Sequence, residues 1–158
     1  KLVVSCENTD TTGAALMAAL RERFHIECEM AAPGYVVAMT GMLDMDENLD
    51  RFAEALRALD KEIRATAPRK PFTAPAIPPR RLSVREALSR EARDLSLREA
   101  RGKTAAEYVW AYPPGVPLAV PGEELTDELL KNLSIQREAG VSLRSTSGGM
   151  PKALRVVE

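Results

Sequence analysis

Few residues in this 158-residue chain have the type and spacing needed for chemistry. His25 is the single histidine, and no serine or cysteine nucleophile stands at a recognisable spacing from it, so a turn or surface position is the simpler interpretation. Cys6 and Cys28 lack the paired spacing of a zinc site, and we expect two small core residues. The chain therefore contains no complete catalytic set.

Two short patterns resemble parts of binding sites. Glu27 and Glu29 share one face of a predicted strand, which is either solvated or lines a cleft supplied by another domain or subunit. Gly102-Lys103-Thr104 resembles the end of a phosphate-binding loop, but that motif needs a glycine five residues earlier, where Leu97 stands. We therefore expect no nucleotide site.

The most informative stretch runs from Tyr112 to Glu123 and reads YPPGVPLAVPGE. Its prolines fix φ and Gly115 can take a positive φ, so the backbone is stiff. Leu118 to Val120 is expected as a short buried strand, and Pro121-Gly122 suits the centre of a type II turn. The simplest interpretation is a rigid connector between two elements.

Residues 1–65 predict the order strand, helix, strand, strand, helix, a two-layer α/β lobe. The second helix has the clearest pattern, because Leu49, Phe52, Leu56 and Leu59 recur at helical spacing. The expected strands are Leu2–Cys6, Ile26–Met30 and Tyr35–Met39. The expected helices run from Asp10 or Thr12 to about Arg23 and from Asp46 to about Ala65.

Residues 66–81 contain five prolines and are expected as an extended linker. Residues 82–158 then predict a second small α+β subdomain. Its first expected helix begins with a capping box at Ser83 to Glu86. Two further helices are expected, from Arg98 to Ala111 and from Asp127 to about Ala139. Short strands are expected at Asp94–Leu97 and Leu154–Val157, and a loop of small residues at Ser145–Pro151. The fold class is therefore α+β throughout.

Composition excludes several function classes. The net charge of −1 argues against a dedicated nucleic-acid or membrane-surface binder, and no apolar run is long enough to span a membrane. Two cysteines and no export signal lead us to expect a cytoplasmic protein. A start at Lys1 inside a strand-like run suggests part of a longer protein.

The stretch Tyr112 to Glu123 resembles the Tyr-Pro-Pro-Gly-Ile-Pro … Pro-Gly-Glu segment of the bacterial ornithine/lysine/arginine decarboxylases, with Val116 in place of isoleucine. Ser83-Val84-Arg85-Glu86-Ala87 is similar to the family's Ser/Thr-Pro-Arg-Glu-Ala. Gly13 at a helix start and Glu29 at the head of a strand pair extend the resemblance to the first lobe. The departures are Ala32, where an acid is common, and Lys103, where arginine is frequent.

The resemblance implies a pyridoxal-phosphate enzyme of the aminotransferase-like fold. Residues 1–65 would be its small C-terminal lobe, 66–81 a linker and 82–158 its C-terminal domain. The family's Schiff-base lysine follows Ser-x-His in a large domain, and no such motif occurs here. The resemblance therefore implies no catalytic residue in this chain, no cofactor bound to it alone and no activity by itself.

The implied partners are the large domain of the same polypeptide, a second copy in a homo-oligomer, and lysine, arginine or ornithine as substrate. The implied role is to help close the mouth of the active site. Tyr112, Glu123 and Glu29 are the residues expected near that mouth, with Glu123 across a strand from Tyr112. The alternatives are that Tyr112 packs in the core and Glu123 caps a helix, and that the chain is a stand-alone binding module derived from the fold.

Overall fold

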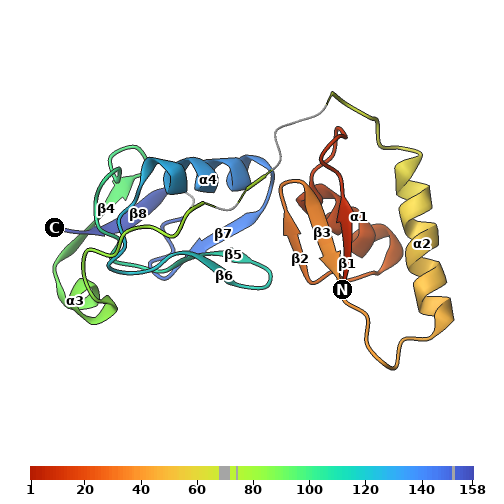
Figure 1. Ribbon diagram of the computed structural model, residues 1–158, viewed down its shortest axis with the longest axis horizontal. Helices are drawn as coiled ribbons and strands as arrows, with labels where there is room; N and C mark the ends of the chain where they lie inside the picture. Colours follow the sequence, from red (N-terminus) through yellow and green to blue (C-terminus); the bar gives the residue numbers. More distant parts are fainter. Residues whose placement is uncertain (68–71, 74, 151) are drawn as a thin grey trace. The chain divides into compact units, whose positions relative to one another are not determined.

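The computed structural model describes all residues except 68–71, 74 and 151, and it divides into two compact units, Lys1–Phe72 and Thr73–Glu158. Both units combine helices and strands, which confirms the expected α+β class (Figure 1). The division falls between Phe72 and Thr73, within the stretch expected as a linker. Pro68 and Pro71 of that stretch lie outside the described residues.

The first unit contains a three-stranded antiparallel sheet in the order β1-β3-β2. Its strands are β1 (Leu2–Ser5), β2 (Met30–Ala32) and β3 (Tyr35–Ala38), and its helices are α1 (Gly13–Phe24) and α2 (Asp46–Asp60). The observed order confirms the prediction. Helix α1 packs on β2 and β3, and α2 adds Ala55 and Leu59 to the same core.

Helix α1 begins where the sequence places a cap and where only glycine fits. The Thr12 side chain accepts a hydrogen bond from Ala15 N, which satisfies one of the unpaired N–H groups of the first turn. A Cβ on Gly13 would lie 2.1 Å from the Tyr35 carbonyl oxygen and 2.2 Å from that of Ala32. Glycine at this position therefore lets the helix start touch the β2–β3 hairpin.

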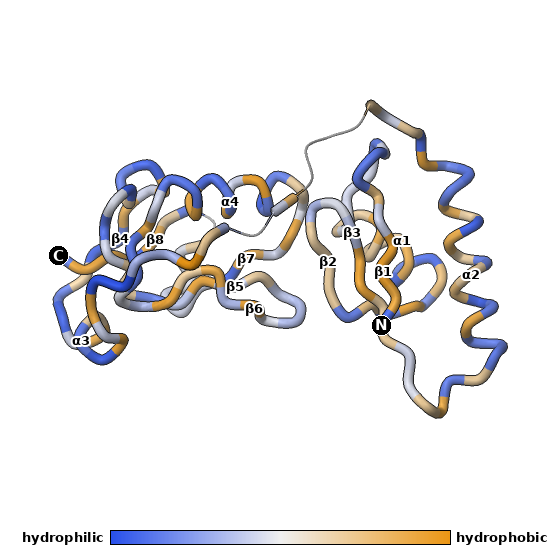
Figure 2. Tube along the Cα trace, in the orientation of Figure 1, coloured by the Kyte–Doolittle hydropathy of each residue, from blue (hydrophilic) through white to orange (hydrophobic). Residues whose placement is uncertain are grey.

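The second unit has two antiparallel sheets, β4-β8 and β6-β5-β7. Helix α4 packs against β6 and β7 over a core that includes Val109, Leu129, Leu133 and Leu154. Its elements are α3 (Val84–Ser89), β4 (Ala92–Ser96), β5 (Val109–Tyr112), β6 (Val116–Ala119), α4 (Asp127–Glu138), β7 (Ser142–Ser145) and β8 (Ala153–Val157). Figure 2 shows that both polar and apolar residues lie along α4, as its single packed face requires.

The helix predicted over Arg98 to Ala111 is wrong. Ser96 and Glu99 form the hydrogen bonds of a capping box, but the turn stops at Gly102, whose φ is 68°. Beyond it the backbone pairs with distant segments, with Gly102 N donating to Leu125 O and Ala105 N to Glu123 O. Residues 109–112 then form β5, as β-branched and aromatic residues favour.

Other predicted elements have different bounds, and one strand was not predicted. The strand expected from Ile26 begins only at Met30, because Ile26 N still donates to Leu20 O at the end of α1. Helix α2 ends at Asp60 instead of about Ala65, since residues 64–66 bond in extended form to residues 8–10. Strand β7 was not predicted.

The connector after Tyr112 also differs from its prediction. A strand and not a helix precedes it, and the strand that follows, β6, is an edge strand with Val116 43% exposed, not a buried strand. Only Ala119 of β6 is fully buried. Pro117 is tolerated because an edge strand leaves one row of N–H groups unpaired.

Candidate functional site

Tyr112 lies at the end of β5 on the outer face of the β6-β5-β7 sheet. Val109 and Ala111 of this strand are buried, whereas Tyr112 is 48% exposed. The guanidinium carbon of Arg144 lies 5.1 Å from the centroid of the Tyr112 ring. The core alternative for Tyr112 is therefore wrong: its ring is at the surface, held between its strand and a cation.

Arg144 was not singled out by sequence reasoning, although a signal for it exists. It comes from β7, which pairs with β5 in the register Trp110 to Arg144 and Tyr112 to Ser142. Buried Val141 and Leu143 alternate with exposed Ser142 and Arg144, the period of a half-buried strand.

The chain turns directly after Tyr112, and Gly115 has the positive φ that the sequence predicts. Gly115 has φ 117° and its N–H donates to Ala111 O at 3.0 Å, so the chain reverses within Pro113 and Pro114. Tyr112 thus lies next to a constrained reversal, which fixes the position from which its side chain leaves the backbone.

Glu123 lies in a second turn and not beside Tyr112. Gly122 has φ 92° and Glu123 N donates to Val120 O at 3.1 Å, which confirms the turn at Pro121-Gly122. The Glu123 carboxylate accepts from Val120 N at 2.9 Å. Ala119 pairs with Val109, so Glu123 continues beyond the end of β5 that is opposite to Tyr112. Strand β6 therefore separates the turn that carries Glu123 from the turn that follows Tyr112.

Glu29 lies in the first unit, directly before β2, and is half-buried. Its N–H donates to Val37 O at 2.8 Å, so it heads the strand pair. Glu27 forms an ion pair with Arg21, and this partner lowers the pKa of the Glu27 carboxyl. Strand β2 begins only at Met30, so Glu27 and Glu29 both precede it and are not an acidic pair on one strand face.

One buried carboxylate was missed by sequence reasoning. Glu107 is 2% exposed and accepts hydrogen bonds from the N–H of Ser147 at 3.0 Å, the hydroxyl of Ser147 at 2.6 Å and the N–H of Arg155 at 2.7 Å. It ties the loop after β7 to β8. Glu107 falls within the wrongly predicted helix over Arg98 to Ala111, and no local pattern marks it as buried.

The two cysteines match the core interpretation. Cys6 and Cys28 are each 4% exposed, and burial raises the pKa of the Cys28 thiol. A buried thiol of raised pKa is a poor nucleophile.

The residues present do not fit a covalently bound aldehyde cofactor. Lys70 lies outside the described residues, and every other lysine is exposed on the surface rather than held in a closed site. No group of three or more metal-ligating side chains occurs in the part of the chain that the structure describes. Nor does that part contain a helix long and apolar enough to cross a membrane.

Comparison with known proteins gives one family. Residues 61–142 match the family model described as Orn/Lys/Arg decarboxylase, C-terminal domain. Over 161 aligned residues the chain is 29% identical to an arginine decarboxylase of Halalkalibacterium halodurans and 28% identical to one of Bacillus subtilis. Each alignment covers 100% of this chain and 33% of the relative, so the chain spans about a third of the length of these curated relatives.

Solved structures share the fold. The lysine decarboxylase LdcF of Francisella novicida superposes with a TM-score of 0.68 at 14% identity, over 99% of this chain and 30% of that one. The constitutive lysine decarboxylase of E. coli gives 0.63 at 17% identity, over 93% of this chain and 28% of that one. At these identities the likeness concerns the fold alone.

Proposed function

Because just over half of its residues match the Orn/Lys/Arg decarboxylase C-terminal domain, the chain belongs to that family, and we propose that it acts as the C-terminal part of a decarboxylase of arginine, lysine or ornithine. The observation that carries the proposal is the alignment of the whole chain with a third of an arginine decarboxylase. Pyridoxal phosphate belongs to the proposal as the cofactor of the complete protein, where it would supply an electron sink for the carbanion left by CO₂ loss.

The chain's own role is then to position groups at the mouth of the active site and not to perform the chemistry. A Schiff base needs a lysine held in the site, and the exposed lysines described here do not offer one. The cofactor lysine would lie in the large domain of the same polypeptide. A homo-oligomer and a cytoplasmic location belong to the same proposal, supported by the family and by the sparse cysteines.

Tyr112 is the best placed of the three mouth residues. Its exposed ring, the rigid turn beside it and Arg144 over its face hold the hydroxyl in a narrow range of positions. A hydroxyl fixed in this way can hydrogen-bond a substrate ammonium or carboxylate. Glu123 and Glu29 stay in the proposal as carboxylates for the cationic end of the substrate, from separate parts of the chain.

The proposed activity is tested by CO₂ release from arginine, lysine and ornithine, measured on the complete protein with pyridoxal phosphate. Release from at least one of the three is expected. No release from any of them, or an upstream reading frame without a Ser-x-His-Lys motif, would leave the stand-alone module as the better account.

The mouth assignment is tested in the same protein with Tyr112→Phe, Glu123→Gln and Glu29→Gln. A mouth residue lowers kcat/KM several-fold without lowering the melting temperature. Values within about twofold of wild type, combined with lower stability, would identify that residue as structural.

A further inference from the structure

The outer face of the β6-β5-β7 sheet carries a row of aromatic side chains beside one cation. Burial alternates along residues 107–112, so Tyr108, Trp110 and Tyr112 lie on the face opposite to the core. Strand β7 pairs with β5 so that Arg144 lies opposite Trp110. The guanidinium carbon of Arg144 lies 5.1 Å from the centroid of the Tyr112 ring. The cation therefore has a defined position on an aromatic surface, next to the ring that carries the Tyr112 hydroxyl.

No neighbouring carboxylate neutralises this cation. Arg144 is the only charged residue among residues 108–112, 116–119 and 142–146, which include all three strands of the sheet. It takes part in none of the ion pairs found in the described part of the chain. Glu123 continues beyond the end of β5 that is opposite to Tyr112. The surface beside Tyr112 is therefore positive, and the proposed carboxylate for the cationic end of the substrate lies elsewhere.

Decarboxylation changes the charge of the substrate. An amino acid that loses CO₂ gains a proton at the carbon atom that carried the carboxylate, so the remaining amine has one positive charge more than the substrate. A fixed cation attracts the carboxylate of the substrate and repels the amine, and both effects favour binding of the substrate. Arginine suits this task, because its planar guanidinium can donate two parallel hydrogen bonds to one carboxylate.

We propose that Arg144 is a specificity-determining residue that binds the substrate carboxylate beside the Tyr112 hydroxyl and disfavours the decarboxylated amine. The inference rests on the proposed function and deepens it, because it assigns the Tyr112 hydroxyl to the carboxylate end of the substrate. A phenolic hydroxyl can donate a hydrogen bond to a carboxylate. Weaker binding of the amine would also make the product leave more readily and inhibit less.

The test measures dissociation constants by calorimetry on the complete protein freed of pyridoxal phosphate, so that no turnover consumes the amino acid. The ligands are arginine, lysine and ornithine, each compared with the amine that its loss of CO₂ leaves. We define the selectivity as the Kd of the amine divided by the Kd of its amino acid. We expect Arg144→Gln to lower the selectivity by about three- to tenfold, because one charge near the carboxylate is lost.

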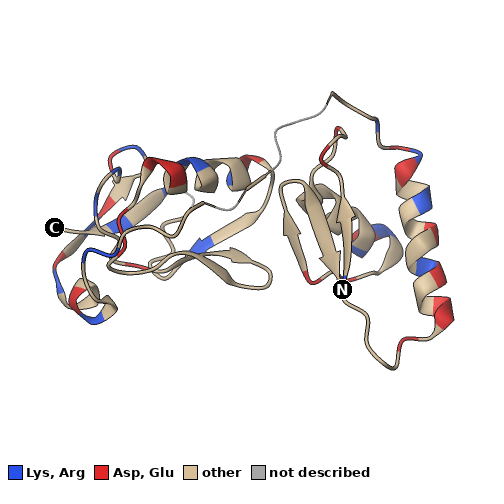
Figure 3. Cartoon of the chain, in the orientation of Figure 1, with Lys and Arg blue, Asp and Glu red and all other residues tan. Residues whose placement is uncertain are grey.

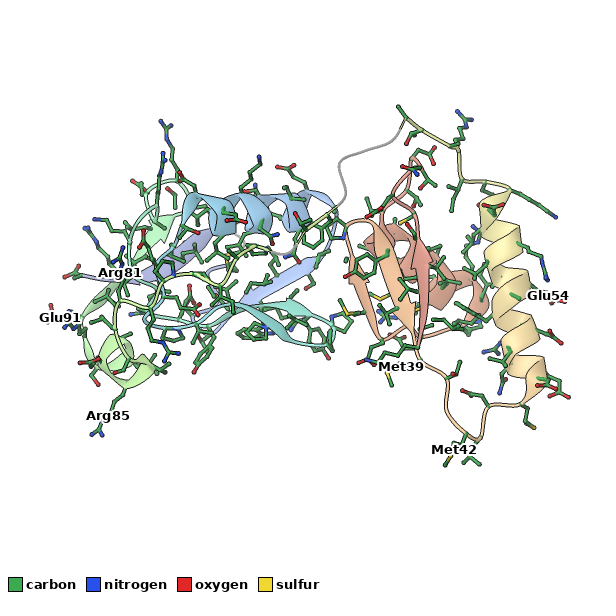
Figure 4. The ribbon with its side chains drawn as sticks, viewed as in Figure 1. Met39, Met42, Glu54, Arg81, Arg85 and Glu91 are labelled. Atoms are coloured by element: carbon green, nitrogen blue, oxygen red, sulfur yellow. The ribbon has the colours of Figure 1, made fainter. Side chains whose placement is uncertain are left out.

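Two control variants separate charge from structure. Arg144→Lys keeps the charge and loses the planar guanidinium, and it should lower the selectivity by no more than about twofold. Arg85→Gln removes an exposed arginine of α3, whose side chain projects away from the ribbon of the second unit (Figure 4), and should leave the selectivity unchanged. High sodium chloride should bring the wild-type selectivity towards that of Arg144→Gln, because salt screens an exposed charge.

A merely structural role of Arg144 predicts a different result: Arg144→Gln would lower the melting temperature and weaken the binding of both ligands by the same factor. That result would overturn the inference. Equal selectivity of the wild type and Arg144→Gln, or an equal fall in Arg85→Gln, would overturn it as well, and so would a wild type that binds neither ligand.

CO₂ release by the complete wild-type protein with pyridoxal phosphate separates the two claims. Release without a fall in selectivity in Arg144→Gln refutes only the role of Arg144. A fall in selectivity without release refutes only the proposed function. Where CO₂ is released, the inhibition constant of the amine divided by the KM of the amino acid should fall in Arg144→Gln by the same factor as the selectivity.

Discussion

The two units of this chain close their apolar surfaces to different extents. The second unit buries Leu125, Leu129, Leu133 and Leu154 almost completely and satisfies a buried carboxylate, Glu107, with three donors. The first unit has a smaller core and leaves seven large apolar side chains exposed in β1, in the loop after β3 and at the start of α2. The second unit also exposes five large apolar side chains, but they are spread over the segment before α3, α3, β5, β6 and α4. Helix α2 of the first unit presents charged residues of both signs along its exposed face (Figure 3).

The largest effect expected in the first unit comes from Gly13→Ala. The added methyl would meet two backbone carbonyl oxygens at 2.1 and 2.2 Å, so α1 must move away from the β2–β3 hairpin. We expect the free energy of unfolding of this unit to fall by about 3 kcal/mol or more, measured by urea titration. Gly41→Ala is the control, because its nearest contact is 3.9 Å away. Equal stability of the two variants would refute the close approach.

The corresponding change in the second unit is Glu107→Ala. It leaves the N–H groups of Ser147 and Arg155 without their acceptor, and we expect the free energy of unfolding to fall by about 2 to 3 kcal/mol. Glu91→Ala, at an exposed position, should change it little. If Glu107→Ala unfolds at the same urea concentration as Glu91→Ala, the second unit does not depend on its buried carboxylate.

A smaller loss of stability is expected from substitutions in the two Ser-x-x-Glu motifs, and circular dichroism should distinguish one motif from the other. Ser83 caps helix α3, whereas Ser96 makes the same hydrogen bonds at a turn that does not continue as a helix. Ser83→Ala and Ser96→Ala should each lower the free energy of unfolding by about 1 kcal/mol. Only Ser83→Ala should reduce helical circular dichroism, and an equal loss from both would contradict the observed turn at Ser96.

The smallest effect expected is on pH dependence. Hydrogen bonds from the Ser83 hydroxyl and N–H lower the pKa of the Glu86 carboxyl, and those from Ser96 do the same for Glu99. A carboxyl with a lowered folded-state pKa stabilises the fold above its unfolded-state pKa, and that contribution is lost as the pH falls through the folded value. The second unit should therefore melt earlier below the ordinary glutamate pKa of 4.5.

We expect high salt to change the acid sensitivity of the two units to different extents. In the first unit the pKa values of Glu27 and Glu62 are lowered mainly by hydrogen bonds from Arg21 and Arg23, as exposed ion pairs that salt screens. High salt should reduce the acid sensitivity of the first unit more than that of the second. Melting temperatures at pH 7 and pH 3.5, each at low and high sodium chloride, measure the pH effect and the salt effect. Glu86→Gln is the reference variant. An equal effect of salt on the acid sensitivity of the two units would contradict this prediction.

Sequence patterns predict the first unit better than the second because its elements are defined by neighbours in the chain. The Thr12 cap and the β2–β3 hairpin depend on short spacings, and both are present. Of the predicted α2 stripe, Phe52, Leu56 and Leu59 pack in the core, whereas Leu49 is 41% exposed. In the second unit, residues 102–106 take their conformation from Leu125, Glu123 and Arg155, which no local pattern shows. The helix predicted over Arg98 to Ala111 is therefore replaced by a turn and the strand β5, because tertiary bonds fix the backbone there.

The candidate site was only partly predictable for the same reason. The turns at Gly115 and Gly122 follow from proline and glycine chemistry and are present. The face on which Tyr112 lies depends on β5 pairing with β7. Spacing therefore shows neither the contact of Arg144 with Tyr112 nor the separation of Tyr112 from Glu123.

The central claim is that this chain is the supporting part of a decarboxylase whose cofactor lysine lies elsewhere in the polypeptide. Absorbance after incubation with pyridoxal phosphate and dialysis tests it most directly, on residues 1–158 and on the complete protein. We expect a retained yellow cofactor in the complete protein and none in residues 1–158. A lysine-linked cofactor that survives dialysis on residues 1–158 would contradict the claim, as would a complete protein that retains none.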